Sequence, residues 1–347
     1  MREVQSVFLY HNYAMIVYAY ALNKRKEKDK MISFQDVLEA RRRIESFVYK
    51  TPLEIAPSLS KDARVYLKLE CQQRQKSFKT RGAFSKISSL SKEERAKGII
   101  AVSSGNHAAG VSYACHMFGI KNCKVIVPET TPQPKIEKIR YYGATVVQKG
   151  ENYDEAHAFA MEVLESEKSV FVDSCSDVQV IAGQGTIGLE ILEQNPDIHT
   201  LLVPIGGGGI ITGISVAAKH LKPDIEVYGV QPKACPAMLR SMQDGRLYSE
   251  YPSKPSACDA LVGGVAEIPY QMSGQCIDDI LLVSEESILA ADAMLLLKEK
   301  IIAEPSSATV AAAVREYPER FAGKNVAAVV TGGNLSAAMM KKLIETV

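Results

Sequence analysis

Short apolar runs alternate with longer segments of mixed apolar and polar residues along most of the chain. Such runs, bounded by glycine, proline and small polar residues, are typical of buried strands, and the longer segments between them are typical of helices. The alternation predicts an α/β fold in which twisted, mostly parallel sheets are flanked by helices. The predicted strands are Gly98–Val102, Lys124–Glu129, Thr145–Lys149, Val170–Asp173, Leu201–Ile205, Glu226–Val230 and Asn325–Val330.

Three of these strands lead into turns of glycine and small polar residues, and a helix follows each turn. The free N–H groups at the start of a helix point into such a turn and favour an anion. The turns are Ser103-Ser104-Gly105-Asn106-His107, Gly206-Gly207-Gly208-Gly209 and Thr331-Gly332-Gly333-Asn334.

The four consecutive glycines predict a phosphate site, because they let backbone amides wrap closely around a ligand. A dinucleotide site would also need an acidic residue at the end of the next strand, to bind the ribose. That strand ends instead in Gln231, and Glu226 lies at its start. A single phosphate group therefore fits better than a pyrophosphate.

Lys79 lies ahead of all three turns, in Ser77-Phe78-Lys79-Thr80-Arg81-Gly82. Most lysines are solvated surface charges. A lysine that accompanies three anion-holding turns, however, indicates Schiff-base chemistry.

Together, and in this order, these segments resemble the pyridoxal-phosphate enzymes of the threonine dehydratase and serine racemase family, the second fold type of that cofactor's enzymes. The resemblance covers about residue 32 to the end. It also rests on Thr51-Pro52-Leu53, Leu67-Lys68-Leu69-Glu70 and Ile181-Ala182-Gly183-Gln184-Gly185-Thr186-Ile187-Gly188.

The resemblance implies pyridoxal 5'-phosphate as the cofactor, bound to Lys79 as a Schiff base. It implies that Phe78 lies against the cofactor ring and that Asn106 bonds the ring hydroxyl, while Thr331 and Glu304 lie near the ring nitrogen. For Glu304 a structural role at a helix start is an equal alternative. The remaining implied contacts are the phosphate with Gly206, Gly207, Gly208 and Gly209, and the substrate carboxylate with Ser103, Ser104, Gly105, Asn106 and His107.

The chemistry that this implies is β-elimination from L-threonine or L-serine, which gives a 2-oxo acid and ammonia. The freed Lys79 amine would remove the α-proton. Thr331 offers a hydroxyl to the ring nitrogen, and a hydroxyl leaves that nitrogen largely neutral. The resulting short-lived carbanion favours prompt loss of the β-hydroxyl.

Ser104 keeps serine racemisation open as an alternative, because racemases of the family have a serine there as a second acid/base group. The preferred interpretation of Ser104 is a helix cap. Two further features differ from racemases or other relatives. Gln231, Cys235 and Ala237 replace a carboxylate metal site, so no metal is expected, and Ala260 replaces a glycine in the pocket wall, which leaves another β-hydroxy amino acid possible as the substrate.

Two other function classes are less favoured by the sequence. A protein that only holds the cofactor would have lost Lys79 or the carboxylate loop, and neither is lost. β-Replacement of the cysteine synthase type is disfavoured, because those relatives have Asn-Thr-Gly where this chain has Asn106-His107-Ala108.

Composition agrees with a soluble enzyme. The 347 residues, 46% hydrophobic and 23% charged, are enough for a sizeable core, and a net charge of +1 predicts no nucleic-acid partner. Seven cysteines without paired spacing indicate reduced thiols and a cytoplasmic location, with no zinc site. The resemblance implies a homodimer or homotetramer.

The resemblance also implies two domains with the cofactor in the cleft between them. We predict a large cofactor-binding domain at 32–96 and 172–347, with a small domain, 97–171, inserted in it. Residues 1–31 are predicted to be a disordered extension that does not span a membrane, and Met31 is an alternative start. No regulatory domain is expected after Val347.

Overall fold

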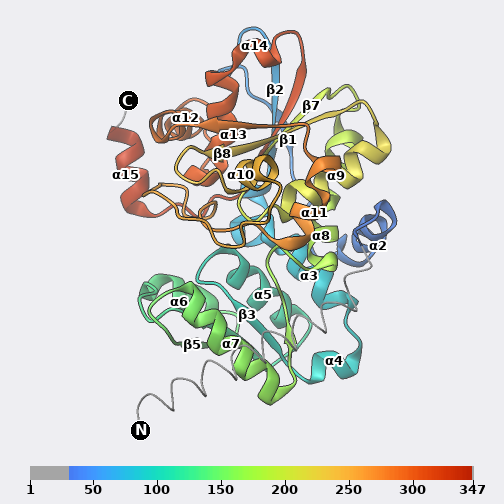
Figure 1. The fold of residues 1–347 in the computed structure, drawn as a ribbon, viewed down its shortest axis with the longest axis vertical. Helices are drawn as coiled ribbons and strands as arrows, with labels where there is room; N and C mark the ends of the chain where they lie inside the picture. The colour runs from blue at the N-terminus through green and yellow to red at the C-terminus, as the bar shows by residue number, and fades with distance from the viewer. Residues whose placement is uncertain (1–30, 346–347) are drawn as a thin grey trace.

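The computed structural model describes residues 31–345, and the interpretation of residues 1–30 lies outside this range. Within it, the strands form two sheets. In Figure 1 the elements from β3 (Ile99–Val102) to α7 (Tyr153–Glu167) lie below strands β2, β7 and β8.

The larger sheet has six strands in the order β1-β2-β10-β7-β8-β9. Only the β1–β2 pair is antiparallel. Parallel pairing suits these strands because most are covered on both faces and are almost wholly apolar. The bounds are Leu53–Ile55 (β1), Arg64–Leu69 (β2), Thr200–Pro204 (β7), Glu226–Pro232 (β8), Asp279–Val283 (β9) and Asn325–Val330 (β10).

Alternate residues of the central strands enter two different cores. On β7, Leu201 and Val203 pack with helices α2, α8, α9 and α11, whereas Leu202 packs with α12 and α13 on the opposite face. Ala327 and Ala328 on β10 divide in the same way. The period of two residues in a strand therefore gives the sheet its two helical layers.

The smaller sheet has four parallel strands in the order β5-β4-β3-β6. On β3, Ile99 and Ala101 face helices α3 and α5, and Ile100 and Val102 face α7. The bounds are Ile99–Val102 (β3), Cys123–Val127 (β4), Thr145–Gln148 (β5) and Val170–Phe171 (β6).

The helices complete the layers. No helix within residues 31–345 is long and apolar enough to cross a membrane. The helices before residue 200 are α2 (Phe34–Ile44), α3 (Lys79–Ser89), α4 (Lys92–Ala96), α5 (Asn106–Met117), α6 (Gln133–Arg140), α7 (Tyr153–Glu167) and α8 (Val178–Gln194), with 3-10 turns at Glu70–Gln72 and Arg74–Lys76. The later ones are α9 (Gly209–Leu221), α10 (Ala237–Asp244), α11 (Glu267–Cys276), α12 (Glu285–Leu297), α13 (Pro305–Glu316), α14 (Pro318–Phe321) and α15 (Ala337–Glu345).

The predicted α/β class with mostly parallel sheets is confirmed. All seven predicted strands are present, with ends that differ by at most two residues. Strands β1, β2 and β9 were not predicted from the sequence. Two of these are the edge strands of the larger sheet, and β2 carries the polar residues Arg64 and Lys68, so its apolar run is interrupted.

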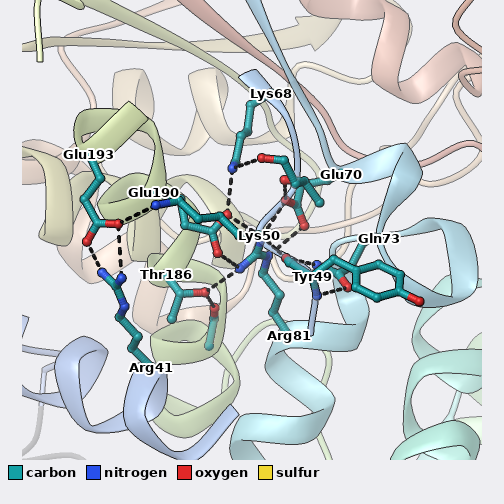
Figure 2. Close-up of polar contacts among 12 residues, drawn as sticks. Arg41, Tyr49, Lys50, Lys68, Glu70, Gln73, Arg81, Thr186, Glu190 and Glu193 are labelled. Atoms are coloured by element: carbon teal, nitrogen blue, oxygen red, sulfur yellow. Dashed lines mark hydrogen bonds and ion pairs between the residues drawn. The ribbon is translucent and has the colours of Figure 1, made fainter. Parts of the chain in front are cut away.

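A buried ion-pair network fixes the start of α3 between β2 and α8 (Figure 2). The guanidinium of Arg81 is fully buried and donates hydrogen bonds of 2.7–2.9 Å to Glu70, at the end of β2, and to Glu190 on α8. Lys68 also donates to Glu190, at 2.6 Å. Two cations and two carboxylates thus balance inside the core.

This balance controls the protonation of Glu190. Burial alone would raise the pKa of its carboxyl, but the nearby charges of Arg81 and Lys68 outweigh burial, and the pKa is lowered. Glu190 is therefore ionised at neutral pH, and its buried charge depends on Arg81 and Lys68 for solvation.

Replacement of Arg81 by Met should lower the free energy of unfolding by about 3–5 kcal/mol, because it leaves two buried carboxylates without their shared cation. Urea unfolding of the wild type and the variant at saturating cofactor measures this loss. The control is Lys341→Met, which removes an exposed pair with Glu345 and should cost within about 0.5 kcal/mol. A loss below about 1 kcal/mol for Arg81→Met would contradict the assignment.

Candidate active site

A cleft of about 1780 Å³ lies where the carboxyl ends of strands from both sheets meet the turns that follow them. In open parallel sheets this is the usual position of a ligand site. Every site residue predicted from the sequence lines this one cleft: Phe78, Lys79, Ser103, Ser104, Gly105, Asn106, His107, Gly206, Gly207, Gly208, Gly209, Glu304 and Thr331. The structure therefore brings together residues that lie far apart in the sequence.

Lys79 is the first residue of α3, and its amine reaches the cleft. The Nζ donates to the backbone oxygen of Ser174 at 3.0 Å and lies 3.6 Å from the Sγ of Cys175. It is also 5.2 Å from the centre of the Phe78 ring. The hydrogen-bond partners of the amine are therefore a backbone carbonyl and a thiol.

The four-glycine turn requires glycine because other groups pack against it. A Cβ on Gly206 would lie 2.9 Å from the backbone oxygen of Ala260, and one on Gly207 would lie 2.9 Å from the Sγ of Cys175. Gly208 has φ of 92°, which disfavours other residues. The turn leads directly into α9, whose first N–H groups have no acceptor within the helix. An anionic group fits this position.

Glu304 occupies the N-cap position of α13, but its side chain makes no capping hydrogen bond. Its Oε1 instead accepts a hydrogen bond from the Nδ2 of Asn106 at 2.9 Å. Burial, and then the charge of Asp259, raise the pKa of Glu304 to about 7. Of the two interpretations of this residue, the side-chain geometry supports the one in the cleft.

The interpretation of Ser104 as a helix cap is wrong. Helix α5 begins at Asn106, its N-cap residue is Gly105, and no side chain caps it. The hydroxyl of Ser103 accepts a hydrogen bond from the N–H of Gly105 at 3.1 Å. Ser103 therefore shapes the turn, while Ser104 lines the cleft without a hydrogen bond to another residue in 31–345.

His107 is neutral at physiological pH. Burial, and then the charge of Lys79, lower the pKa of its imidazole to about 4. Its Nε2 lies 2.8 Å from the backbone oxygen of Val172, and because a carbonyl only accepts, this nitrogen carries the proton. The ring therefore supports the turn, and an anion would meet backbone N–H groups here rather than a cationic ring.

Several residues in the cleft were not predicted. Ser174 and Cys175 follow β6, and Lys138 lies on α6. Ser307 is buried and contacts Thr331, and their hydroxyl oxygens are 2.9 Å apart. The position of Cys175 just after a predicted strand was the one signal in the sequence, since turns at the carboxyl ends of parallel strands gather at ligand sites.

The pyridoxal-phosphate dependent enzyme family matches residues 44–332. The chain belongs to this family. It is 40% identical over 317 residues to an L-threonine ammonia-lyase of Thermotoga maritima, which covers 90% of this chain and 78% of the relative. It is 34% identical over 318 residues to a serine racemase of Dictyostelium discoideum, which covers 90% of this chain and 98% of the relative.

Solved structures agree with this assignment. The maize serine racemase has a TM-score of 0.86 and 29% identity, covering 91% of this chain and 98% of that one. The processed form of threonine deaminase isoform 2 from Solanum lycopersicum has a TM-score of 0.85 and 34% identity, covering 90% of this chain and 93% of that one. The predicted family and fold type are confirmed, and the cofactor is pyridoxal phosphate.

The residues of the cleft fit a pyridoxal-phosphate dependent enzyme. Lys79 supplies an amine whose hydrogen-bond partners are a carbonyl and a thiol, and Gly206–Gly209 supply a turn in which a Cβ would meet other atoms closely. Asn106 and Thr331 supply polar groups in the same cleft. We assign these residues to the amine, phosphate and ring contacts of the cofactor as proposals.

In this pyridoxal-phosphate dependent enzyme, Asp292 on α12 is fully buried, and neither carboxyl oxygen has a hydrogen-bond partner in residues 31–345. Burial, and then the charge of Glu304, raise the pKa of Asp292 to about 8. The native carboxyl therefore keeps its proton well above the pH at which the unfolded chain releases it. The native state loses stability as the pH rises from about 4 to about 8.

Replacement of Asp292 by Asn should remove this loss, because the amide does not ionise. The melting temperature of the variant minus that of the wild type should rise by at least about 2 °C from pH 6 to pH 9. Thermal unfolding across this range tests the gain. Glu162→Gln, at an exposed position on α7, should show no such trend, and a constant difference for Asp292→Asn would refute the buried neutral acid.

Proposed function

We propose that this protein is a lyase that converts L-threonine and/or L-serine to a 2-oxo acid and ammonia. The water that is lost in the β-elimination is regained when the released unsaturated amine hydrolyses. The observation that carries the proposal is Lys79, whose amine enters the cleft beside a neutral carbonyl oxygen and a thiol. The names of two relatives support the same reaction. One is the L-threonine ammonia-lyase of Thermotoga maritima. The other is the catabolic L-threonine dehydratase of Escherichia coli, which is 36% identical over 319 residues, covering 91% of this chain and 97% of the relative.

Each loop of the cleft has a separate task in this reaction. The backbone N–H groups at the start of α5 bind the substrate carboxylate. The Lys79 amine takes the α-proton as a general base. The bound cofactor supplies an electron sink that makes this proton acidic. Thr331 offers a hydroxyl rather than a carboxylate to the ring, which favours fast loss of the β-hydroxyl.

We also propose the wider organisation of the protein. The six-stranded and four-stranded sheets support a division into a large domain, 32–96 and 172–347, and a small one, 97–171. A homodimer or homotetramer in the cytoplasm, with a small hydroxy amino acid as its substrate and neither nucleic acid nor membrane as a partner, remains part of the proposal.

Replacement of Lys79 by Ala should abolish both the visible absorbance of the bound cofactor and the release of 2-oxo acid. Loss of a general base alone costs about 100- to 10,000-fold in rate. The assay follows 2-oxo acid and ammonia from L-threonine and from L-serine. Full activity of the variant would refute the role of Lys79, and no product from either amino acid with the wild type would refute the proposed substrates.

Serine racemisation is the second candidate, because the Ser104 hydroxyl lines the cleft and caps no helix. If Ser104 is the second acid/base group, Ser104→Ala should lower D-serine formation by at least about 100-fold and change 2-oxo acid release by less than about tenfold. Both products are measured from the same L-serine reaction. Equal loss of the two products would show that Ser104 serves substrate binding instead.

A further inference from the structure

A lysine from the four-stranded sheet side of the cleft reaches a turn on the six-stranded sheet side. Lys138 lies in the last turn of α6, between β4 and β5, and it lines the cleft. Its Nζ lies 2.5 Å from the Oδ1 of Asn334, in the turn that follows β10. This hydrogen bond therefore connects elements of the two sheets across the cleft.

The contact is unusual for a lysine because its partner is neutral. Lys138 forms no ion pair within residues 31–345 and lies partly buried beside an amide oxygen. Burial lowers the pKa of its ammonium group, and the charge of Glu304 opposes that change. A lysine gains little from leaving water for such a position. The contact therefore indicates a specific structural role for the hydrogen bond to Asn334.

Asn334 passes the interaction on to Asn106. The Nδ2 of Asn334 donates to the Oδ1 of Asn106 at 2.6 Å and to the backbone oxygen of Gln75 at 2.9 Å. The Nδ2 of Asn106 donates in turn to Glu304 at 2.9 Å. Four side chains from α6, the final turn, the start of α5 and the start of α13 thus form one chain of hydrogen bonds.

The groups at the two ends of this chain of hydrogen bonds determine the orientation of both amides. An ammonium group only donates, so the group of Asn334 that faces Lys138 is its oxygen. The amide nitrogen of Asn334 then faces Asn106, which must present its oxygen and direct its own nitrogen to the carboxylate of Glu304. A cation at one end and a carboxylate at the other keep both amides in one orientation.

The backbone near Asn334 supports the same arrangement. Gln75 and Lys76 have φ of 59° and 58°, a region that non-glycine residues seldom adopt. In this conformation the Gln75 oxygen accepts from Asn334, and the Lys76 oxygen accepts from the N–H of Gly333. The strained segment, which leads directly into Phe78 and Lys79, is therefore held by the turn that Lys138 contacts.

We propose that Lys138 is a positioning residue that acts through Asn334 to hold Asn106 with its amide nitrogen available to the ring hydroxyl of the cofactor. The inference rests on the proposed function, which places Asn106 at that hydroxyl. One N–H of Asn106 is occupied by Glu304, and the other is left for the ligand. If the chain of amides were reversed, Asn106 would present an oxygen there instead.

The test replaces Lys138 with Met, which keeps most of the apolar stem and removes the donor. We expect the affinity of the apoenzyme for pyridoxal phosphate to fall by about tenfold, as for loss of a charge-assisted hydrogen bond. We also expect a shift in the visible absorbance maximum of the holoenzyme, because this band reports on the state of the ring hydroxyl. Lys138→Arg, which keeps a cationic donor, should restore both values most of the way.

The matched control is Arg140→Met on the same helix. Arg140 is exposed and does not line the cleft, and its loss should leave both values unchanged. Wild-type affinity and absorbance in Lys138→Met, or an equal change in the control, would overturn the inference. Both readouts are taken without substrate, so a failure of the proposed reaction would appear separately, as absence of product with the wild type.

Discussion

The ion-pair network around Arg81 is the constraint on which the position of Lys79 depends. Arg81 lies two residues after Lys79, in the first turn of α3, and binds Glu70 and Glu190 with no exposure to solvent. Helix α3 also contributes Phe84 and Ile87 to the core of the four-stranded sheet and packs against α8. One short helix thus lies against both sheet layers, and the buried charges fix its first turn, from which the Lys79 amine extends.

The electrostatic pattern of the cleft follows from the topology. Helices α5 and α9 both begin at the carboxyl ends of strands, so both direct the positive ends of their dipoles into the cleft. Lys79 brings its amine into the same cleft. Glu304, one of the carboxylic acids of the cleft, is nearly buried, and its pKa of about 7 shows how strongly burial opposes its charge. A ligand with two separated anionic groups and one polar ring fits this distribution.

The sequence was sufficient wherever one segment carried its own signal. The apolar runs of β3, β7 and β10 predicted their burial, and the glycines between β7 and α9 predicted a turn with no room for side chains. Contacts between distant segments left no such signal. Neither the Lys138–Asn334 contact nor the Ser307–Thr331 contact follows from spacing, since each joins elements that only the folded sheets bring together. Ser104 was misread because Gly105 takes the N-cap position and Ser103 supplies the local hydroxyl.

The surroundings of Lys79 show how the fold positions the carbonyl that meets its amine. Asp173 lies two residues after β6 and one residue before Ser174, whose carbonyl Lys79 contacts. The Oδ1 of Asp173 accepts from the N–H groups of Cys175 and Ser176, at 2.8 and 2.6 Å. These bonds shape the turn that presents the Ser174 carbonyl to Lys79. A carbonyl orients an amine without stabilising its protonated form as strongly as a carboxylate would, and only the unprotonated amine is a nucleophile or a base.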